Sequence, residues 1–312
     1  MRIAVVGGAG FIGSHVIDHL VDAGHDVVVV DLVAPHREVE WHEVGILDLN
    51  GLVHATVGCD TVFHLAAVSN VNHVEADPVA AVEVNVTGTA MVWEAARRNG
   101  VGRAVLASTV WVYGGADDGI EVDEEHTFDA ATTGHVYTST KLAGEMIAHN
   151  YFDLYGQPFT ILRYGIPYGP RMRPELVIPR FVRMGLAGEP LRINGDGSQF
   201  RKYVYIDDLA RAHVLALSDV AENEVFNLEG AEPITILRVA EAVRDTLDRD
   251  VAIERVPARP GDFAGRAVSG AKAERILGWK PTVSFEDGVR RYVEWYIAEA
   301  ETEPAGPRPA EA

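Results

Sequence analysis

The first two-thirds of the chain alternates short, β-branched apolar runs with stretches of helical periodicity. The apolar runs, predicted as strands, cover residues 2–8, 26–31, 60–67, 103–108 and 158–165. Stretches predicted as helices cover residues 12–22, 79–98 and 137–156. Strands that are apolar on both faces and separated by helices are typical of a parallel sheet that is covered on both sides. The pattern therefore predicts an α/β fold with a doubly wound parallel sheet.

The pattern changes after Gly169, where prolines and glycines cluster and the strand–helix alternation is lost. A helix over 205–217 and a strand over 224–230 are expected to return to the sheet. Amphipathic helices are expected over 235–247 and 286–300. We therefore expect a first domain over 1–167, completed by about 204–230, and a smaller α/β domain over 168–203 and 231–300. Residues 301–312 carry no apolar side chain beyond alanine and predict a disordered tail.

Composition and charge narrow the classes of function. The chain has 312 residues, 47% hydrophobic and 23% charged, which is the balance of a globular protein. No apolar run is long enough for a membrane span, and no export signal is expected at the start. Cys59 is the only cysteine, so no intrachain disulfide can form, and a cytoplasmic location is expected. The net charge of −19 argues against nucleic acid and against an anionic membrane as partners.

A glycine-rich segment follows the first strand and opens the first helix. It places Gly7, Gly10 and Gly13 at the spacing of a phosphate-binding turn. This spacing permits a tight turn, close approach of backbone to a pyrophosphate, and close packing of helix on strand. Asp31 ends the second strand, where a carboxylate can accept hydrogen bonds from both ribose hydroxyls and would repel a 2′-phosphate. The motif predicts a dinucleotide site that takes NAD rather than NADP.

A tyrosine and a lysine share one face of the helix predicted over 137–156. Tyr137 and Lys141 are separated by one helical turn in the segment YTSTK. Together with the glycine turn, this motif resembles the extended short-chain dehydrogenases/reductases of the nucleotide-sugar epimerase/dehydratase family. The resemblance runs from Met1 to about Ala298 and includes GGAGFIGS, GILDL, HLAA, NVTGT, STVWVYG, LRYGIPYGP, GDGSQFRKYVYIDDLA and ARPGD, in the family's order. It implies Tyr137, Lys141 and Thr109 as catalytic residues.

The resemblance also implies the cofactor contacts. It places Asp48 near the adenine, although a turn or helix-cap role is the alternative, and it gives Asn85 a structural role that ties strands together. His64 is interpreted as a packed strand residue, and no metal site is expected. The implied cofactor-binding residues are Gly7, Gly10, Phe11, Ile12, Gly13, Asp31, Asp48, Leu49, Leu65, Ala66, Ala67, Lys141 and Tyr164.

On the substrate side the resemblance implies a nucleotide-diphosphate sugar. Arg201 and Arg259 would meet the diphosphate, and Asp262 the ribose. Trp111 is either a wall of the sugar site or a packing residue. Arg173 either meets a phosphate or sugar carboxylate or is a loop arginine, and Ser69 with Asn70 could touch sugar hydroxyls. One departure is Ile166, which stands where the family has asparagine.

The Tyr–Lys pair suggests a specific chemistry. A free tyrosine has a pKa of about 10, too high for a base at neutral pH. A neighbouring ammonium and a nicotinamide cation would both favour the phenolate, so we expect a lowered pKa at Tyr137. Tyr137 would then remove a sugar hydroxyl proton while the carbon's hydride passes to NAD and Thr109 holds the same oxygen. The product would be a ketosugar.

Three fates of that ketosugar divide the family: epimerisation, dehydration and decarboxylation. Resembling dehydratases carry an Asp-Glu pair directly after the catalytic threonine, and decarboxylases commonly carry a glutamate at the second of these positions. Here the two positions are Val110 and Trp111, which cannot transfer protons. The sequence therefore favours an NAD-dependent 4-epimerase. Alternatives are a nucleotide-4-ketosugar reductase and a non-catalytic dinucleotide sensor. A homodimer through helices near 79–98 and 138–155 is expected from similar proteins.

Overall fold

The computed structural model describes residues 1–114, 120–128, 131, 134–258 and 265–302. Its central element is a seven-stranded sheet in the order β11-β6-β5-β4-β1-β2-β3, in which every neighbouring pair is parallel. The doubly wound α/β class predicted from the sequence is confirmed. The strands of this sheet are β1 (Arg2–Val6), β2 (Asp26–Asp31), β3 (Glu40–Glu43), β4 (Thr61–His64), β5 (Arg103–Thr109), β6 (Phe159–Tyr164) and β11 (Glu224–Leu228).

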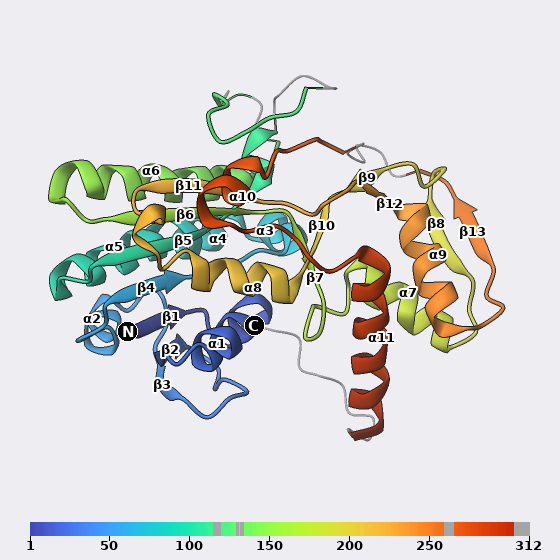
Figure 1. Ribbon diagram of the computed structural model, residues 1–312, viewed down its shortest axis with the longest axis horizontal. Helices are drawn as coiled ribbons and strands as arrows, with labels where there is room; N and C mark the ends of the chain where they lie inside the picture. The colour runs from blue at the N-terminus through green and yellow to red at the C-terminus, as the bar shows by residue number, and fades with distance from the viewer. Residues whose placement is uncertain (115–119, 129–130, 132–133, 259–264, 303–312) are drawn as a thin grey trace.

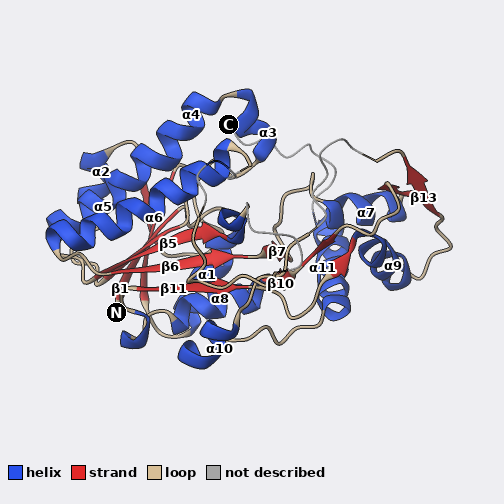
Figure 2. Ribbon diagram, turned by 90° about the horizontal axis from the view of Figure 1, so that it is seen from above, coloured by secondary structure: helices blue, strands red, loops and turns tan. Residues whose placement is uncertain are grey.

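Helices cover both faces of the sheet (Figures 1 and 2). Alternate residues of one strand point to opposite faces, so Val5 packs on the face of α1 while Ala4 packs on the face of α2 and α5. This explains why the strands read as continuous apolar runs. Helices on one face are α2 (Leu49–Ala55), α3 (Val71–Ala76), α4 (Pro78–Val82), α5 (Gly88–Asn99) and α6 (Val136–Tyr155); on the other are α1 (Phe11–Asp22), α8 (Ile206–Leu215) and α10 (Ala271–Leu277).

The long helix expected over 79–98 is present but not uniform. A π-helical turn, η1 (Glu83–Thr87), joins α4 to α5. It contains the buried Asn85, whose side chain accepts from the Val68 backbone N–H at 2.8 Å and donates to the Val68 carbonyl at 3.0 Å. Asn85 also donates to Thr140 Oγ1 at 3.0 Å. Asn85 therefore ties the loop after β4 to helix α6, rather than one strand to another.

A smaller unit lies beyond one end of the sheet, at the right in Figure 1. It has three two-stranded pairings, β10 with β7, β12 with β9 and β13 with β8, and α9 packs against α7 and α11. Its elements are β7 (Ile166–Tyr168), α7 (Val177–Leu186), β8 (Leu191–Asn194), β9 (Phe200–Arg201), β10 (Tyr203–Tyr205), β12 (Ile234–Thr235), α9 (Ile236–Leu247), β13 (Ile253–Val256) and α11 (Phe285–Thr302). Short 3₁₀ turns are η2 (Val110–Tyr113) and η4 (Asp219–Ala221).

The chain crosses between the two units more than once. It leaves the sheet after β6 and comes back as α8 and β11, and β11 pairs with β6. Most of the expected tail falls outside the described residues. Among the helices that the structure describes, none is both long and apolar enough to cross a membrane.

Candidate active site

The glycine turn lies at the carboxyl end of β1, against the loop that follows β4. Gly7 has φ +86°, and a Cβ there would lie 2.4 Å from the Ala66 nitrogen. A Cβ on Gly13 would lie 2.2 Å from the Gly7 carbonyl oxygen. Gly10 is exposed and begins α1 without a side-chain cap. The first N–H groups of α1 are therefore available to an anion such as a pyrophosphate.

Two carboxylates predicted to bind the cofactor already have partners in the protein. Asp31 Oδ2 accepts from the Ala9 N–H at 2.9 Å, which places this carboxylate beside the glycine turn. Asp48 is the N-cap of α2, and its Oδ1 accepts from the Gly51 N–H at 3.0 Å. The capping alternative for Asp48 is thus observed, and its contact with adenine stays a prediction.

The three residues predicted as catalytic lie at the ends of β5 and α6. Tyr137 is half-buried in the first turn of α6, and the buried Lys141 Nζ lies 5.9 Å from the centre of its ring. Lys141 Nζ donates to the Ala107 carbonyl at 3.0 Å. Ala107 stands two residues before Thr109, the last residue of β5, so the lysine links helix α6 to strand β5.

Tyr164 lies beside Thr109 in the sheet, and its hydroxyl bonds to a buried histidine of α8. The two residues are register partners of β6 and β5. Tyr164 Oη lies 2.6 Å from His213 Nε2, and His213 Nδ1 lies 2.9 Å from the Leu209 carbonyl. A carbonyl only accepts, so the imidazole proton is on Nδ1 and Nε2 accepts from Tyr164. Burial lowers the pKa of His213 to about 4, which keeps the ring neutral.

Burial makes the Tyr137 phenol less acidic in the protein alone. It raises the pKa of Tyr137 to about 12, and the Arg173 guanidinium offsets only part of that rise. Burial also lowers the pKa of Lys141 to about 8, against the pull of Glu145. Among the protein's own groups, desolvation of Tyr137 thus outweighs the Arg173 guanidinium. The expected lowering of the tyrosine pKa relied on a nicotinamide cation as well and stays a prediction. A lowered pKa at Tyr137 requires a further positive charge.

A buried polar network supports the site from behind, and sequence reasoning missed it. Arg163 of β6 donates to both carboxylate oxygens of Glu145, at 3.0 Å and 2.7 Å. Ser108 Oγ donates to Glu145 Oε1 at 2.5 Å, and Arg163 Nη1 donates to Tyr113 Oη at 2.6 Å. Glu145 stands one helical turn after Lys141. That spacing was the available signal, since it puts an acid on the inward face of the catalytic helix.

Residues predicted on the substrate side fall into two groups. The Trp111 ring stands nearly perpendicular to the Tyr137 ring, with centres 6.1 Å apart, and Arg173 acts electrostatically on Tyr137. These two are beside the proposed catalytic tyrosine.

Among the other residues predicted on the substrate side, some have partners elsewhere and some are not described. Asn70, next to Ser69, caps α3 by accepting from the Asn72 N–H at 3.1 Å. Arg201 is half-buried on β9, and its Nη1 donates to the Phe200 carbonyl at 2.7 Å. Arg259 and Asp262 lie outside the described residues.

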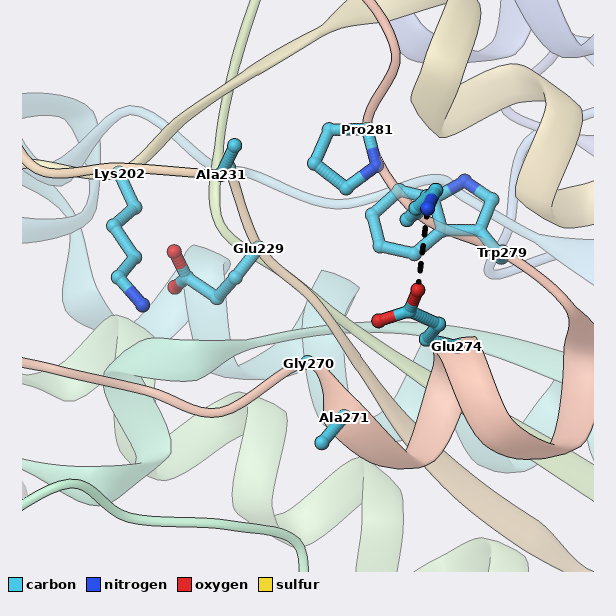
Figure 3. Close-up of a pocket in the computed structure, with 10 residues that line it drawn as sticks. Lys202, Glu229, Ala231, Gly270, Ala271, Glu274, Trp279 and Pro281 are labelled. Atoms are coloured by element: carbon cyan, nitrogen blue, oxygen red, sulfur yellow. Dashed lines mark ion pairs between the residues drawn. The ribbon is translucent and has the colours of Figure 1, made fainter.

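A pocket of about 310 Å³ lies apart from these residues, and none of the predicted site residues lines it. Figure 3 shows Lys202 and Glu229 directed toward one another inside it, with Trp279 and the Glu274–Lys280 ion pair on the far side. Glu229 is buried, and its Oε2 has no hydrogen-bond partner among the described residues. Burial raises the pKa of Glu229 to about 8. The carboxyl therefore holds its proton to a higher pH than a free glutamate does.

Comparison with known proteins finds a matching family and similar proteins of known structure. Residues 3–228 match the model of the NAD dependent epimerase/dehydratase family. A probable UDP-glucuronate 4-epimerase of Rhizobium meliloti is 31% identical over 95% of this chain and 97% of its own length. A dTDP-glucose 4,6-dehydratase of Escherichia coli is 32% identical over 96% and 93%. The crystal structure of UDP-glucose 4-epimerase from Thermotoga maritima with UDP-glucose matches with a TM-score of 0.89 and 32% identity, over 96% of this chain and 99% of that one.

Gly10 and Gly13 of the turn should respond differently to an added methyl group. Gly13→Ala should destabilise the cofactor-free protein by about 1–3 kcal/mol, since its Cβ meets backbone at 2.2 Å. Gly10→Ala meets backbone only at 3.4 Å and should keep the wild-type melting temperature. It should still weaken NAD binding about tenfold or more, because the methyl group faces the pyrophosphate. Thermal melts give the stability of each variant, and calorimetric titrations give its NAD affinity. Equal melting temperatures for Gly10→Ala and Gly13→Ala would contradict the packing argument.

Glu229 should make stability fall as pH rises. Its carboxyl keeps a proton to about pH 8 in the folded protein but loses it near ~4.3 in the unfolded chain. The unfolded state therefore binds fewer protons between these values, and the free energy of unfolding declines with rising pH. Glu229→Gln should reduce the loss between pH 5 and 8 by up to about 4 kcal/mol in denaturant titrations. Glu274→Gln, which changes another residue lining the same pocket, is the control. If the free energy of unfolding depends on pH identically in Glu229→Gln and wild type, Glu229 is ionised in the folded protein.

Proposed function

Because this chain belongs to the NAD dependent epimerase/dehydratase family and its cofactor is therefore NAD, we propose that it is a 4-epimerase of a nucleotide-activated sugar. The observation that carries the proposal is the arrangement after Thr109. Tyr137 and Lys141 lie on α6, Lys141 is bonded to β5 two residues before Thr109, and the two positions after Thr109 hold Val110 and Trp111. Oxidation to a ketosugar needs the first three groups, whereas dehydration needs a proton donor and acceptor that these two side chains lack.

Each group has a defined part in the proposed reaction. Tyr137 accepts the proton of the sugar hydroxyl, and Thr109 Oγ1 holds the same oxygen. Lys141 keeps a positive charge near the phenol while its ammonium stays bonded to the Ala107 carbonyl. NAD, when held by the glycine turn, Asp31 and Lys141, would accept the hydride and add the positive charge that Tyr137 requires. Inversion would be completed when the hydride returned to the opposite face of the ketosugar carbon while Tyr137 gave the proton back to its oxygen.

The substrate is proposed to be a nucleotide-diphosphate sugar held by the smaller unit. We assign NAD to 1–167 with 204–230, and the nucleotide sugar to 168–203 with 231–300. Arg201 is proposed for the diphosphate, and Arg173, beside Tyr137, for an anionic group on the sugar. The loop that carries Arg173 is tied to α1 by the Arg171–Asp18 ion pair at 2.7 Å. A cytoplasmic location also stays a prediction.

A homodimer is proposed through the face formed by α5 and α6, which lie side by side in Figure 2. On α6, Met146 is 66% exposed and Leu154 is 70% exposed. Phe152 and Tyr155 add exposed aromatic surface to the same helix. A second copy of this face would bury these side chains in a four-helix contact.

A panel of UDP-, dTDP-, GDP- and CDP-sugars, with and without a sugar carboxylate, tests the proposed activity. NMR should show a product inverted at C4, with no change in mass and no net consumption of NAD. Loss of water or of carbon dioxide would identify a dehydratase or decarboxylase instead, and stoichiometric consumption of NADH would identify a reductase.

Tyr137→Phe should lower turnover by about 10²–10⁴-fold, because the proton acceptor is removed. NAD affinity and the melting temperature should stay close to wild type, since the Tyr137 hydroxyl makes no hydrogen bond that the structure describes. Tyr155→Phe, at the exposed end of the same helix, is the matched control and should leave turnover unchanged. Unaltered turnover in Tyr137→Phe would reject its role as the base.

Met146→Glu combined with Leu154→Glu should convert the dimer to a monomer, because two carboxylates would be buried at the contact. Multi-angle light scattering gives the molar mass directly. Val220→Glu is the control, since Val220 is 53% exposed on η4, away from α6. A monomeric wild type, or a dimer that survives both substitutions, would reject the proposed interface.

A further inference from the structure

Two aromatic rings pack beside the Tyr137 phenol, those of Trp111 and of His135, and the sequence analysis passed over His135. The centre of the His135 ring lies 5.1 Å from that of Trp111 and 6.2 Å from that of Tyr137. The Trp111 and Tyr137 rings are 6.1 Å apart. The three centres form a closed triangle, and each contact is edge-on or tilted, as favourable aromatic pairs are.

His135 is anchored by the backbone of the catalytic helix. It is the N-cap of α6, and its Nδ1 accepts from the Thr138 N–H at 3.3 Å. Thr138 Oγ1 lies 3.0 Å from the same nitrogen. A backbone N–H only donates, so Nδ1 carries a lone pair and the ring proton is on Nε2. Burial lowers the pKa of His135, which favours this neutral form.

Trp111 connects the same cluster to the catalytic strand. Its backbone N–H donates to Thr109 Oγ1 at 3.2 Å. The His135 ring thus bridges the start of α6, with Tyr137, and the end of β5, with Thr109. By contrast, no hydrogen bond from the described residues holds the Tyr137 hydroxyl. Packing of its ring is therefore what orients the phenol before substrate arrives.

We propose that His135 is a positioning residue for Tyr137: its ring, fixed to the Thr138 amide and packed on Trp111, holds the phenol toward Thr109. The inference rests on the proposed function, in which Tyr137 accepts the sugar proton and Thr109 holds the same oxygen. His135 itself makes no chemical step. It restricts the rotation of a half-buried tyrosine to the orientation from which the proton can be taken.

Two substitutions separate the anchor from the ring. His135→Asn keeps an oxygen that can cap α6 but removes the aromatic surface. His135→Phe keeps an aromatic ring but removes the acceptor. We expect His135→Asn to melt close to wild type and to lose about tenfold in kcat, the scale of one aromatic contact. Its KM for the nucleotide sugar and its NAD affinity should not change.

His135→Phe should show the opposite pattern, with a lower melting temperature and a kcat near that of wild type below the melting transition. His149→Asn is the matched control, because the exposed His149 packs on Phe159 at 4.6 Å, away from Tyr137. It should change neither kcat nor KM. An unchanged kcat in His135→Asn, or an equal loss of kcat in folded His135→Phe, would overturn the proposal.

A measurement without substrate tests the anchor independently. Imidazole nitrogen shifts of protein labelled with ¹⁵N-histidine should show His135, assigned by its absence in His135→Asn, with the proton on Nε2. A proton on Nδ1 would show that His135 does not accept from the Thr138 N–H, and it would contradict the proposal even if the enzyme were active. If wild type converts none of the sugars while the Nε2 tautomer is found, the proposed function fails and the geometry around His135 stands.

Discussion

The buried ion pair between Glu145 and Arg163 is the interaction on which the site depends. It joins helix α6, which carries Tyr137 and Lys141, to strand β6 of the sheet. Two unpaired charges at this depth would cost several kcal/mol each, and the pair is tolerable because nearly every oxygen and N–H finds a partner. Ser108 adds a hydrogen bond from β5, next to Thr109. The pair therefore fixes the catalytic helix against both strands whose ends form the site.

The parallel sheet brings the remaining parts to the same edge. Because all its strands run in one direction, the glycine turn after β1, the loop after β4 and Thr109 at the end of β5 open on one side. The packing there is tight, since even a methyl group on Gly7 would reach the backbone at Ala66. A dinucleotide can approach backbone N–H groups closely in such a turn, and a sugar beside it would meet Tyr137.

The environment of Tyr137 sets the condition for its chemistry. Burial favours the neutral phenol, and the Arg173 guanidinium does not supply enough positive charge to reverse this. A tyrosine that can accept a proton only when the oxidised cofactor is bound would not deprotonate a sugar in the absence of a hydride acceptor. The rings of Trp111 and His135 pack beside this phenol, and in the proposed mechanism they set its orientation.

The sequence by itself determined the doubly wound sheet, the glycine turn and the shared helical face of Tyr137 and Lys141, because these follow from local periodicity and spacing. Only the tertiary structure decided that Asp48 caps a helix and that Arg163 pairs with Glu145. It also showed that burial raises the pKa of Tyr137 in the protein alone, and it brought His135 against Trp111. Those outcomes depend on burial and on contacts between segments distant in the chain, which no local pattern of residues records.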